Sequence, residues 1–369
     1  MNFSKLQFSF WVLLLPVCLS ATAFSADYSA SLKTGKAELQ SAGALAFGPD
    51  GILFVGDSMG AAIYALDTQD RSEATSHHPF EISGIDQKVA ALLGTAADQI
   101  LINDLAVNPI SQKVYLSVSR GRGPEALPVI VRVDTSGKIE EFSLDNVAHA
   151  SVALTNAPGT EEVDRRGQSR RLETITDLAF VDERVVVAGL SNEEFASKLR
   201  SIPFPFKDAG EGTSVEIYHG AHGRFETNAP VRTFVPFEID GESHILAAYT
   251  CTPLVTFPVS SLEPGAKVMG TTIAELGNRN RPLDMVVYEK GGLNFILMNN
   301  SSRGVMKINA QGLEGYQGIT ARTDITGVPY ETIEDLQAVE QLDRLNGSDA
   351  LILVRADTGS LDLKTIALP

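Results

Sequence analysis

Short apolar runs alternate with turn residues along the chain, most clearly between residues 42 and 67. Apolar runs at 44–47, 52–55 and 61–66 are separated by a Pro-Asp-Gly turn at 49–51 and a Gly-Asp-Ser break at 56–58. Short apolar runs bounded by Gly, Pro and Asp are typical of β-strands. This stretch therefore predicts three neighbouring strands joined by tight turns.

The same pattern begins again further along the chain. Counting the first, its starts lie near residues 44, 104, 177, 245, 284 and 335, and the copy near 245 is degenerate. Repeats of roughly 40 to 70 residues made of short strands indicate a radial array of sheets. We expect an all-β fold, a six-bladed β-propeller with short helical insertions, formed by residues 27–369 as one domain. Residues 28–39 are expected to complete the last blade, because circular closure pairs otherwise exposed edges.

Two insertions in this rhythm have simple interpretations. Residues 86–94 predict a short helix with an aspartate cap at its start and Gly94 at its end. Residues 158–171 are rich in both acidic and basic side chains, which predicts a solvated loop.

The third insertion covers residues 191–213. Ser191 and Glu194 form a capping box, which predicts a helix over residues 192–200. The Phe-Pro run after it cannot pair as a central strand, because its prolines lack the N–H donor. Phe204 and Phe206 therefore either pack an oversized loop onto the propeller edge or form a lid over a central pocket.

Residues 1–26 have the features of a secretion signal. Lys5 supplies the positive charge, residues 8–15 the apolar core, and Ala21-Thr22-Ala23 a small-residue cleavage site. The apolar run is too short to span a membrane, and no later run is longer. We expect a secreted protein, periplasmic or extracellular, with no membrane span. Loss of the signal leaves Cys251 as the one cysteine, so no internal disulfide is expected.

The formal net charge of −16 narrows the choice of partners. Strong acidity disfavours binding to nucleic acid or to an anionic membrane. It does not identify a ligand, so a small molecule or a protein partner remains open.

The opening repeat and its Val55-Gly56-Asp57-Ser58 segment resemble the NHL and gluconolactonase-like six-bladed propellers. The resemblance implies a metal held by a glutamate of the first blade and by Asn or Asp residues of later inner strands. Asn103, in an Asn-x-Leu-Ala frame, is similar to one of those asparagines. The other matching positions carry Ala42 or Gly43, Thr176 and Leu283, so the implied metal-binding set is incomplete.

An aspartate recurs at the expected inner-strand starts, as Asp104, Asp177, Asp284 and Asp335. In a propeller these positions surround the central channel, and a ring of carboxylates suits Ca²⁺ or Mg²⁺. Alternatively, each aspartate accepts backbone N–H groups and fixes the junction between blades. Asp104 and Asp177 are the candidate metal ligands of this ring.

The histidines offer a second candidate site. His219 and His222 lie in a glycine-bounded turn, and His244 and Cys251 flank the fourth expected strand. Imidazole with thiolate suits a transition metal such as zinc or copper. Along one strand His244 and Cys251 would lie about 20 Å apart, so we do not expect all four to converge. Cys251 then packs as a small buried apolar residue.

Arginine and amide side chains form a third cluster, in residues 278–282 and 299–303. Arg281 and its neighbours could hold a carboxylate or phosphate, or pair with surface acids. The two segments are expected at opposite ends of a strand pair unless their loops return to the same face.

These sites leave two classes of function. The first is a binding scaffold that takes a small ligand or a protein on its channel face or its 191–206 segment. The alternative is a metal-dependent hydrolase of the lactonase or esterase type, with Asn103 and the channel aspartates. No Ser-His-Asp order and no G-x-S-x-G motif supports acyl transfer by a serine nucleophile.

Overall fold

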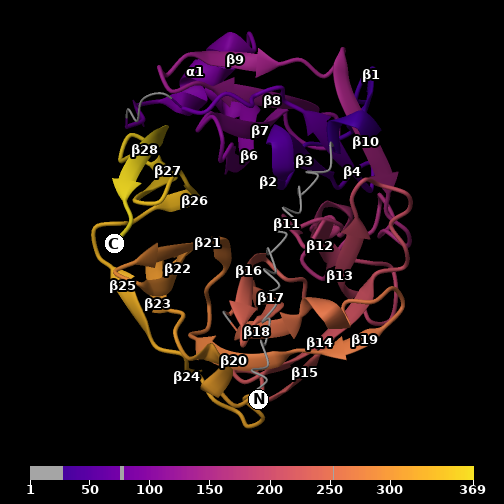
Figure 1. Cartoon of the computed structure of the whole chain (residues 1–369), viewed down its shortest axis with the longest axis vertical. Coiled ribbons are helices and arrows are strands. Elements are labelled where there is room, and N and C mark those ends of the chain that lie inside the picture. Colours follow the sequence, from indigo (N-terminus) through magenta and orange to yellow (C-terminus); the bar gives the residue numbers. More distant parts are fainter. Residues whose placement is uncertain (1–27, 75–78, 252) are drawn as a thin grey trace, which may run out of the picture.

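The computed structural model of the protein describes residues 28–74, 79–251 and 253–369. Six β-sheets surround a central channel and form a six-bladed β-propeller, as Figure 1 shows. This confirms the fold expected from the repeats. We number the blades in the chain order of their innermost strands. The signal predicted for residues 1–26 lies outside the described residues.

The strands of the first three blades follow from the innermost outward. Blade 1 contains β2 (Leu45–Phe47), β3 (Ile52–Asp57), β4 (Ala62–Asp67), β10 (Val147–Ala153) and β1 (Lys33–Gly35). Blade 2 contains β6 (Ile100–Val107), β7 (Val114–Arg120), β8 (Leu127–Val133) and β9 (Ile139–Phe142). Blade 3 contains β11 (Asp177–Val181), β12 (Arg184–Leu190), β13 (Ser197–Pro203), β14 (Thr213–His219), β15 (Arg224–Glu226) and β19 (Lys267–Met269), the last parallel to β14.

The other three blades are built in the same way. Blade 4 contains β16 (Thr233–Ile239), β17 (Glu242–Ala248), β18 (Pro253–Pro258), β20 (Thr271–Leu276) and β24 (Ile325–Gly327). Blade 5 contains β21 (Pro282–Lys290), β22 (Leu293–Asn300), β23 (Gly304–Asn309) and β25 (Tyr330–Ile333). Blade 6 contains β26 (Val339–Arg344), β27 (Asp349–Arg355), β28 (Leu361–Ala367) and β5 (Glu81–Ile82).

Helical structure is confined to the connections. The described residues contain one α-helix, α1 (Ile85–Leu92), which confirms a helix in the predicted segment 86–94, and Gly94 follows it with φ of 65°. The predicted aspartate cap is wrong, because the N-cap is Gly84 and Asp86 lies within the helix. Single 3₁₀ turns are η1 (Tyr28–Ser31), η2 (Pro49–Gly51), η3 (Ala97–Gln99), η4 (Arg171–Glu173), η5 (Val259–Ser261) and η6 (Leu313–Gly315).

The order of the blades around the channel differs from their order in the chain. The innermost strand of blade 1 contacts those of blades 2 and 3, and the innermost strand of blade 6 contacts that of blade 2. The ring therefore runs through blades 1, 3, 4, 5, 6 and 2. Two strands make this order possible. After blade 1 the chain forms β5 at the outer edge of blade 6, and after blade 2 it forms β10, which lies in blade 1 between β4 and β1.

The prediction that residues 28–39 complete the last blade is wrong. Within this segment β1 pairs with β10 in blade 1, whereas β5 pairs with the C-terminal strand β28. The backbone N–H of Thr365 donates to the carbonyl of Phe80 at 2.9 Å and extends this pairing. The outer edge of blade 6 is still covered, but by the short strand β5, which the pattern of apolar residues does not predict.

Two inner strands lie away from their predicted positions. The fourth is β16, and the segment near residue 245 is the second strand, β17. Pro236 obscures the β16 pattern, but an innermost strand has a free edge and tolerates a proline there. The sixth is β26, which begins at Val339, so Asp335 lies in the turn before it and is exposed.

The helix predicted at residues 192–200 is also wrong. Residues 197–203 form β13, which pairs with β12 along its whole length. Ser191 closes a turn instead of capping a helix, because its N–H donates to the carbonyl of Ala196 at 2.8 Å. Long-range strand pairing here overrides a local capping signal.

Phe204 and Phe206, which follow β13, pack between blades 1 and 3. Phe204 is 4 % exposed, and its ring lies 5.0 Å from the ring of Phe54 and 5.7 Å from that of Tyr28 between centroids. Phe206 lies 5.0 Å from Phe204 on the same measure. This geometry favours the packing alternative over a lid.

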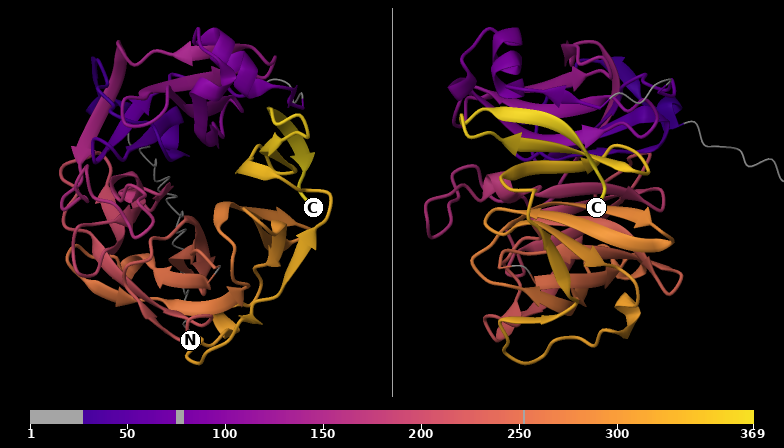
Figure 2. Two further views of the ribbon diagram at one scale, coloured as in Figure 1. Left: turned by 180° about the vertical axis from the view of Figure 1, so that it is seen from behind. Right: turned by 90° about the vertical axis from the view of Figure 1, so that its left-hand side faces the viewer.

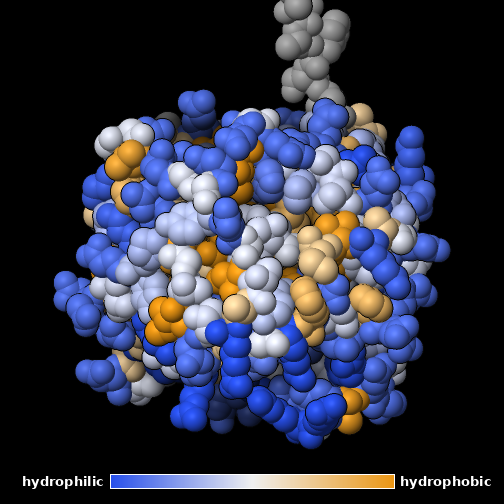
Figure 3. All heavy atoms as spheres, turned by 90° about the horizontal axis from the view of Figure 1, so that it is seen from below, coloured by the Kyte–Doolittle hydropathy of each residue, from blue (hydrophilic) through white to orange (hydrophobic). Residues whose placement is uncertain are grey.

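The side view in Figure 2 shows the blades stacked around the channel, with connections projecting from both faces. Seen from below the view of Figure 1, the rim is mostly hydrophilic with several separate hydrophobic areas (Figure 3). Among the described residues, no helix is long and apolar enough to cross a membrane.

Candidate functional site

The central channel narrows at a ring of aspartates. Asp104, Asp177 and Asp284 line two cavities in turn, one of about 140 Å³ and one of about 370 Å³, which open toward opposite ends of the channel. Asp343, from β26, lines the larger one. The sequence analysis assigned the fourth position to Asp335, which lies outside the channel; Asp343 takes it.

Each ring aspartate links two blades. The Oδ2 atoms of Asp104, Asp177, Asp284 and Asp343 accept the backbone N–H groups of Leu45, Phe234, Leu342 and Val107, at 2.7, 2.7, 2.8 and 2.7 Å. Inner strands of adjacent blades form no ladder with one another, so these N–H groups need side-chain acceptors. The recurrence of aspartate at this position follows from that need.

Burial in the narrow channel raises the pKa of every ring carboxyl. It raises the pKa of Asp177 to about 7 and that of Asp343 to about 6. Burial also raises the pKa of Asp104 and of Asp284 well above the ordinary range, and the charges of the other ring carboxylates add to this. With a pKa of about 7, Asp177 is partly protonated at neutral pH.

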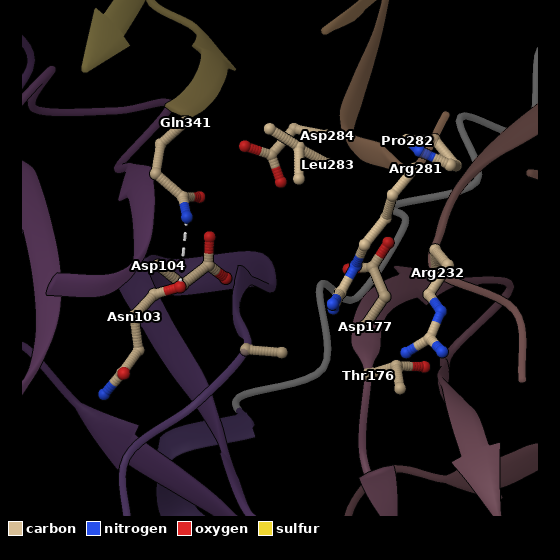
Figure 4. A pocket seen from close by; sticks show the side chains of 11 residues that line it. Asn103, Asp104, Thr176, Asp177, Arg232, Arg281, Pro282, Leu283, Asp284 and Gln341 are labelled. Atoms are coloured by element: carbon tan, nitrogen blue, oxygen red, sulfur yellow. Dashed lines mark hydrogen bonds between the residues drawn. The ribbon is translucent and has the colours of Figure 1, made fainter. Parts of the chain in front are cut away.

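Asn103 lies beside the ring and lines the smaller cavity. Its Nδ2 donates to the carbonyl of Ala42 at 2.7 Å and to Ser119 Oγ at 2.9 Å, which holds it against blade 1. Gln341 Nε2 donates to the Asn103 carbonyl at 3.1 Å, the dashed contact in Figure 4. Asn103 therefore has a definite structural role at this boundary.

A larger cavity, of about 770 Å³, adjoins the channel mouth. It is lined by six arginines, namely Arg165, Arg166, Arg170, Arg232, Arg279 and Arg281. Arg232 and Arg281 also line the small channel cavity, so the two spaces meet at these side chains. Figure 4 shows both guanidinium groups turned into the space opposite Asn103 and Asp104.

The two arginines differ in their partners. Arg232 Nη1 lies 2.6 Å from Glu173 Oε1, and its Nε donates to Thr250 Oγ1 at 3.1 Å. Among the described residues, the Arg281 guanidinium has no hydrogen-bond or ion-pair partner. Desolvation in the pocket and the like charge of Arg232 lower the pKa of Arg281.

The segments 278–282 and 299–303 lie at the same end of their strand pair. Pro282 starts β21 and pairs with Asn300, the last residue of β22, because the strands are antiparallel. Asn280 Nδ2 donates to Asn300 Oδ1 at 2.7 Å, and the N–H of Ser301 donates to the Arg281 carbonyl at 2.9 Å. These bonds fix the backbone that carries Arg281. The expectation of opposite ends was wrong.

The four candidate ligands do not all converge, as expected from the sequence. His219, His222 and Cys251 lie together at the wall of the 770 Å³ cavity, where Cys251 is partly exposed, so the expectation that it packs as a buried apolar residue is wrong. His244 does not join them; it lies in β17, and its Nδ1 is 2.9 Å from the Glu242 carbonyl. Sequence patterns also missed Glu226, which contacts both clustered histidines, since no motif connects β15 to the turn before it.

Comparisons with known proteins find only distant structural likenesses at low sequence identity. No protein-family model matches the sequence, and no curated protein matches it. A PQQ-bound aldose sugar dehydrogenase from Streptomyces coelicolor is 13% identical, covering 90% of this chain and 96% of that one, with a TM-score of 0.30. A streptogramin B lyase is 11% identical, covering 91% and 97%, with a TM-score of 0.30. A chain of a mitotic checkpoint complex is 8% identical, covering 97% and 99%, with a TM-score of 0.38. Likeness at this level carries no argument about activity.

Proposed function

We propose that this propeller is a binding protein for a small organic anion, held at the channel mouth by Arg281 and Arg232. The single observation that carries the proposal is the guanidinium of Arg281, which has no partner among the described residues and lines a cavity beside a second arginine. The charge of Arg232 opposes that of Arg281, although Glu173 offsets part of this effect, and an anion bound to both arginines would relieve the repulsion. A planar guanidinium pair suits a carboxylate, which it can bind through two parallel hydrogen bonds.

The net charge of the chain strengthens this interpretation. A protein with a formal charge of −16 has abundant acids with which an arginine can pair. Arginines that nevertheless line one cavity form a local positive field, which concentrates anions there.

The floor of the small cavity is compatible with an anion. Burial raises the pKa of Asp104 and of Asp284 well above the ordinary range, which favours their neutral forms and weakens the repulsion of a carboxylate. A protonated carboxyl also has an O–H donor. The alternative, a metal-dependent hydrolase using Asn103 and the channel aspartates, has less support, because both oxygens of Asp104 and of Asp177 accept backbone N–H groups.

Thermal unfolding with added ligands tests the proposal. Gluconate and citrate should raise the midpoint by several degrees, because a ligand that binds only the native state stabilises it. Glucose, which is neutral, should have no effect. Arg281→Gln should weaken anion binding at least tenfold, and Arg344→Gln at the opposite channel mouth is the matched control. Equal shifts with glucose and gluconate, or unchanged anion binding by Arg281→Gln, would contradict the proposal.

We also propose that the protein is exported, on the strength of the signal predicted at residues 1–26. N-terminal sequencing of the protein recovered from the periplasm or medium should begin after residue 23. An unprocessed chain retained in the cytoplasm would contradict export.

A further inference from the structure

His219, His222 and Cys251 form a cluster that the anion pocket does not require. His219 ends β14, His222 lies in the turn that follows, and Cys251 comes just after β17 in the next blade. One ligand atom from each side chain, an imidazole nitrogen or the thiol sulfur, lies within 4.8 Å of the other two. The two imidazole rings are 3.9 Å apart between centroids.

Glu226 determines which nitrogens are available. Its Oε2 is 2.9 Å from His219 Nδ1, and its Oε1 is 2.7 Å from His222 Nδ1. A carboxylate group is a hydrogen-bond acceptor, so at each of these contacts the imidazole Nδ1 is the donor and Nε2 is left with a lone pair. A carboxylate behind a histidine is the usual support of a metal-binding imidazole.

The buried side of the cluster contains two polar atoms without partners. His219 is 2 % exposed and Glu275 is not exposed at all. Among the described residues, neither His219 Nε2 nor Glu275 Oε2 has a hydrogen-bond partner, and the two atoms lie 4.0 Å apart. Buried polar atoms of this kind are rare unless an ion or a water completes the site. The separation is too long for a hydrogen bond, but a water lying to one side of the two atoms can contact both.

The donor types select the metal. Ca²⁺ and Mg²⁺ prefer oxygen ligands, whereas two imidazoles and a thiolate suit a borderline-soft ion such as Zn²⁺. Three protein ligands leave one coordination position open, as in zinc sites that bind water or a substrate. The three side chains line the 770 Å³ cavity, so that position is reachable from solvent.

We propose that His219, His222 and Cys251 bind one zinc ion, that Glu226 orients both histidines, and that the fourth position holds a water facing Glu275. The site shares the 770 Å³ cavity with Arg281, but Arg281 is not one of its ligands, so zinc binding does not require the anion. It uses residues of two blades, so the ion joins blade 3 to blade 4 at the pocket wall.

Metal titration of the full chain, after removal of metal by EDTA, tests the proposal. Zinc should bind with a stoichiometry of one, and cobalt should produce a thiolate-to-metal charge-transfer band. Cys251→Ser should remove that band, and His222→Ala should weaken zinc binding at least tenfold; Glu226→Gln should weaken it by roughly tenfold to a hundredfold. His244→Ala, a histidine outside the cluster, is the matched control and should bind zinc as the wild type does.

Two further measurements make the result decisive. His222 is exposed, so its replacement should leave the circular dichroism spectrum unchanged and cannot act through misfolding. Arg281→Gln should leave zinc binding unchanged, which separates this proposal from the anion site. The absence of the cobalt band in the wild type, or equal zinc affinity for the wild type, Cys251→Ser and His222→Ala, would overturn the zinc site.

Discussion

Replacing Asp177 by asparagine should change how the stability of the protein depends on pH. Burial raises the pKa of Asp177 to about 7 from an ordinary value of 3.8. Because the folded state holds this proton more tightly than the unfolded chain, the group stabilises the fold fully below about pH 4. That contribution is lost as the pH rises through 7. Asparagine has nearly the same shape as aspartate but does not ionise, so the stability of the Asp177→Asn variant should not fall for this reason as the pH rises.

The size of the effect follows from the shift. About three pKa units correspond to roughly 4 kcal/mol between pH 4 and pH 8, which is an upper value. The channel is open to water, which screens the carboxylate, so we expect about 2 kcal/mol. Asp343, with a pKa of about 6, adds to the fall in wild-type stability over a narrower range, from about pH 4 to pH 6.

Urea unfolding at intervals between pH 4 and pH 8 measures this directly. The free energy of unfolding of Asp177→Asn, relative to the wild type, should rise by about 2 kcal/mol from pH 4 to pH 8. Asp335→Asn is the matched control, because Asp335 is exposed and lies outside the ring. A constant difference between Asp177→Asn and the wild type across this range would refute the assignment of a proton to the ring.

Two further predictions concern packing and turns. Phe204→Ala should lower the free energy of unfolding, measured in urea, by about 3 to 5 kcal/mol, because it empties a buried aromatic position between blades 1 and 3. Phe225→Ala is the control and should change this free energy little, because the Phe225 ring is exposed. Asp57→Ala should lower the free energy of unfolding by about 2 kcal/mol or more, because the Asp57 carboxylate accepts the N–H groups of Gln40, Ser41 and Gly60. Loss of these hydrogen bonds should make the three amides exchange hydrogen faster in Asp57→Ala than in the control variant Asp67→Ala.

Most of the fold could be predicted because each blade repeats a local pattern. The inner strands near residues 44, 104, 177 and 284 were found since apolar runs and turns specify them from nearby sequence. The fourth was misplaced because Pro236 interrupts its pattern, and the sixth because a longer link precedes Val339. The partners of β5 and β10 could not be predicted, because pairing across more than one blade leaves no local signal.

The candidate site was harder to predict for a related reason. Arg281 and the His219–His222 pair were identified as candidates from their residue types, and Cys251 was considered with them but expected to pack as a buried apolar residue; their other neighbours were not identified. Arg232 and Cys251 reach the same cavity from different loops, and nothing in the repeat sets their distance from one another. Glu226 and Glu275 support the histidines from separate strands, which only the folded chain brings together.

The recurrent aspartates link neighbouring blades. This role explains why an aspartate recurs on several inner strands, and also why these residues say little about which ligand the protein binds. Adjacent blades lack a shared strand ladder, so each boundary must satisfy its inner-strand N–H groups in another way, and a carboxyl oxygen does this at four of them. At these four boundaries the side chain is needed whatever the protein binds. Binding groups have no such requirement and lie in loops and at strand ends, where, among the described residues, the Arg281 guanidinium and His219 Nε2 have no hydrogen-bond partner. In this propeller, unsatisfied polar groups at these positions are therefore a better indication of the ligand site than the aspartates that recur in four blades.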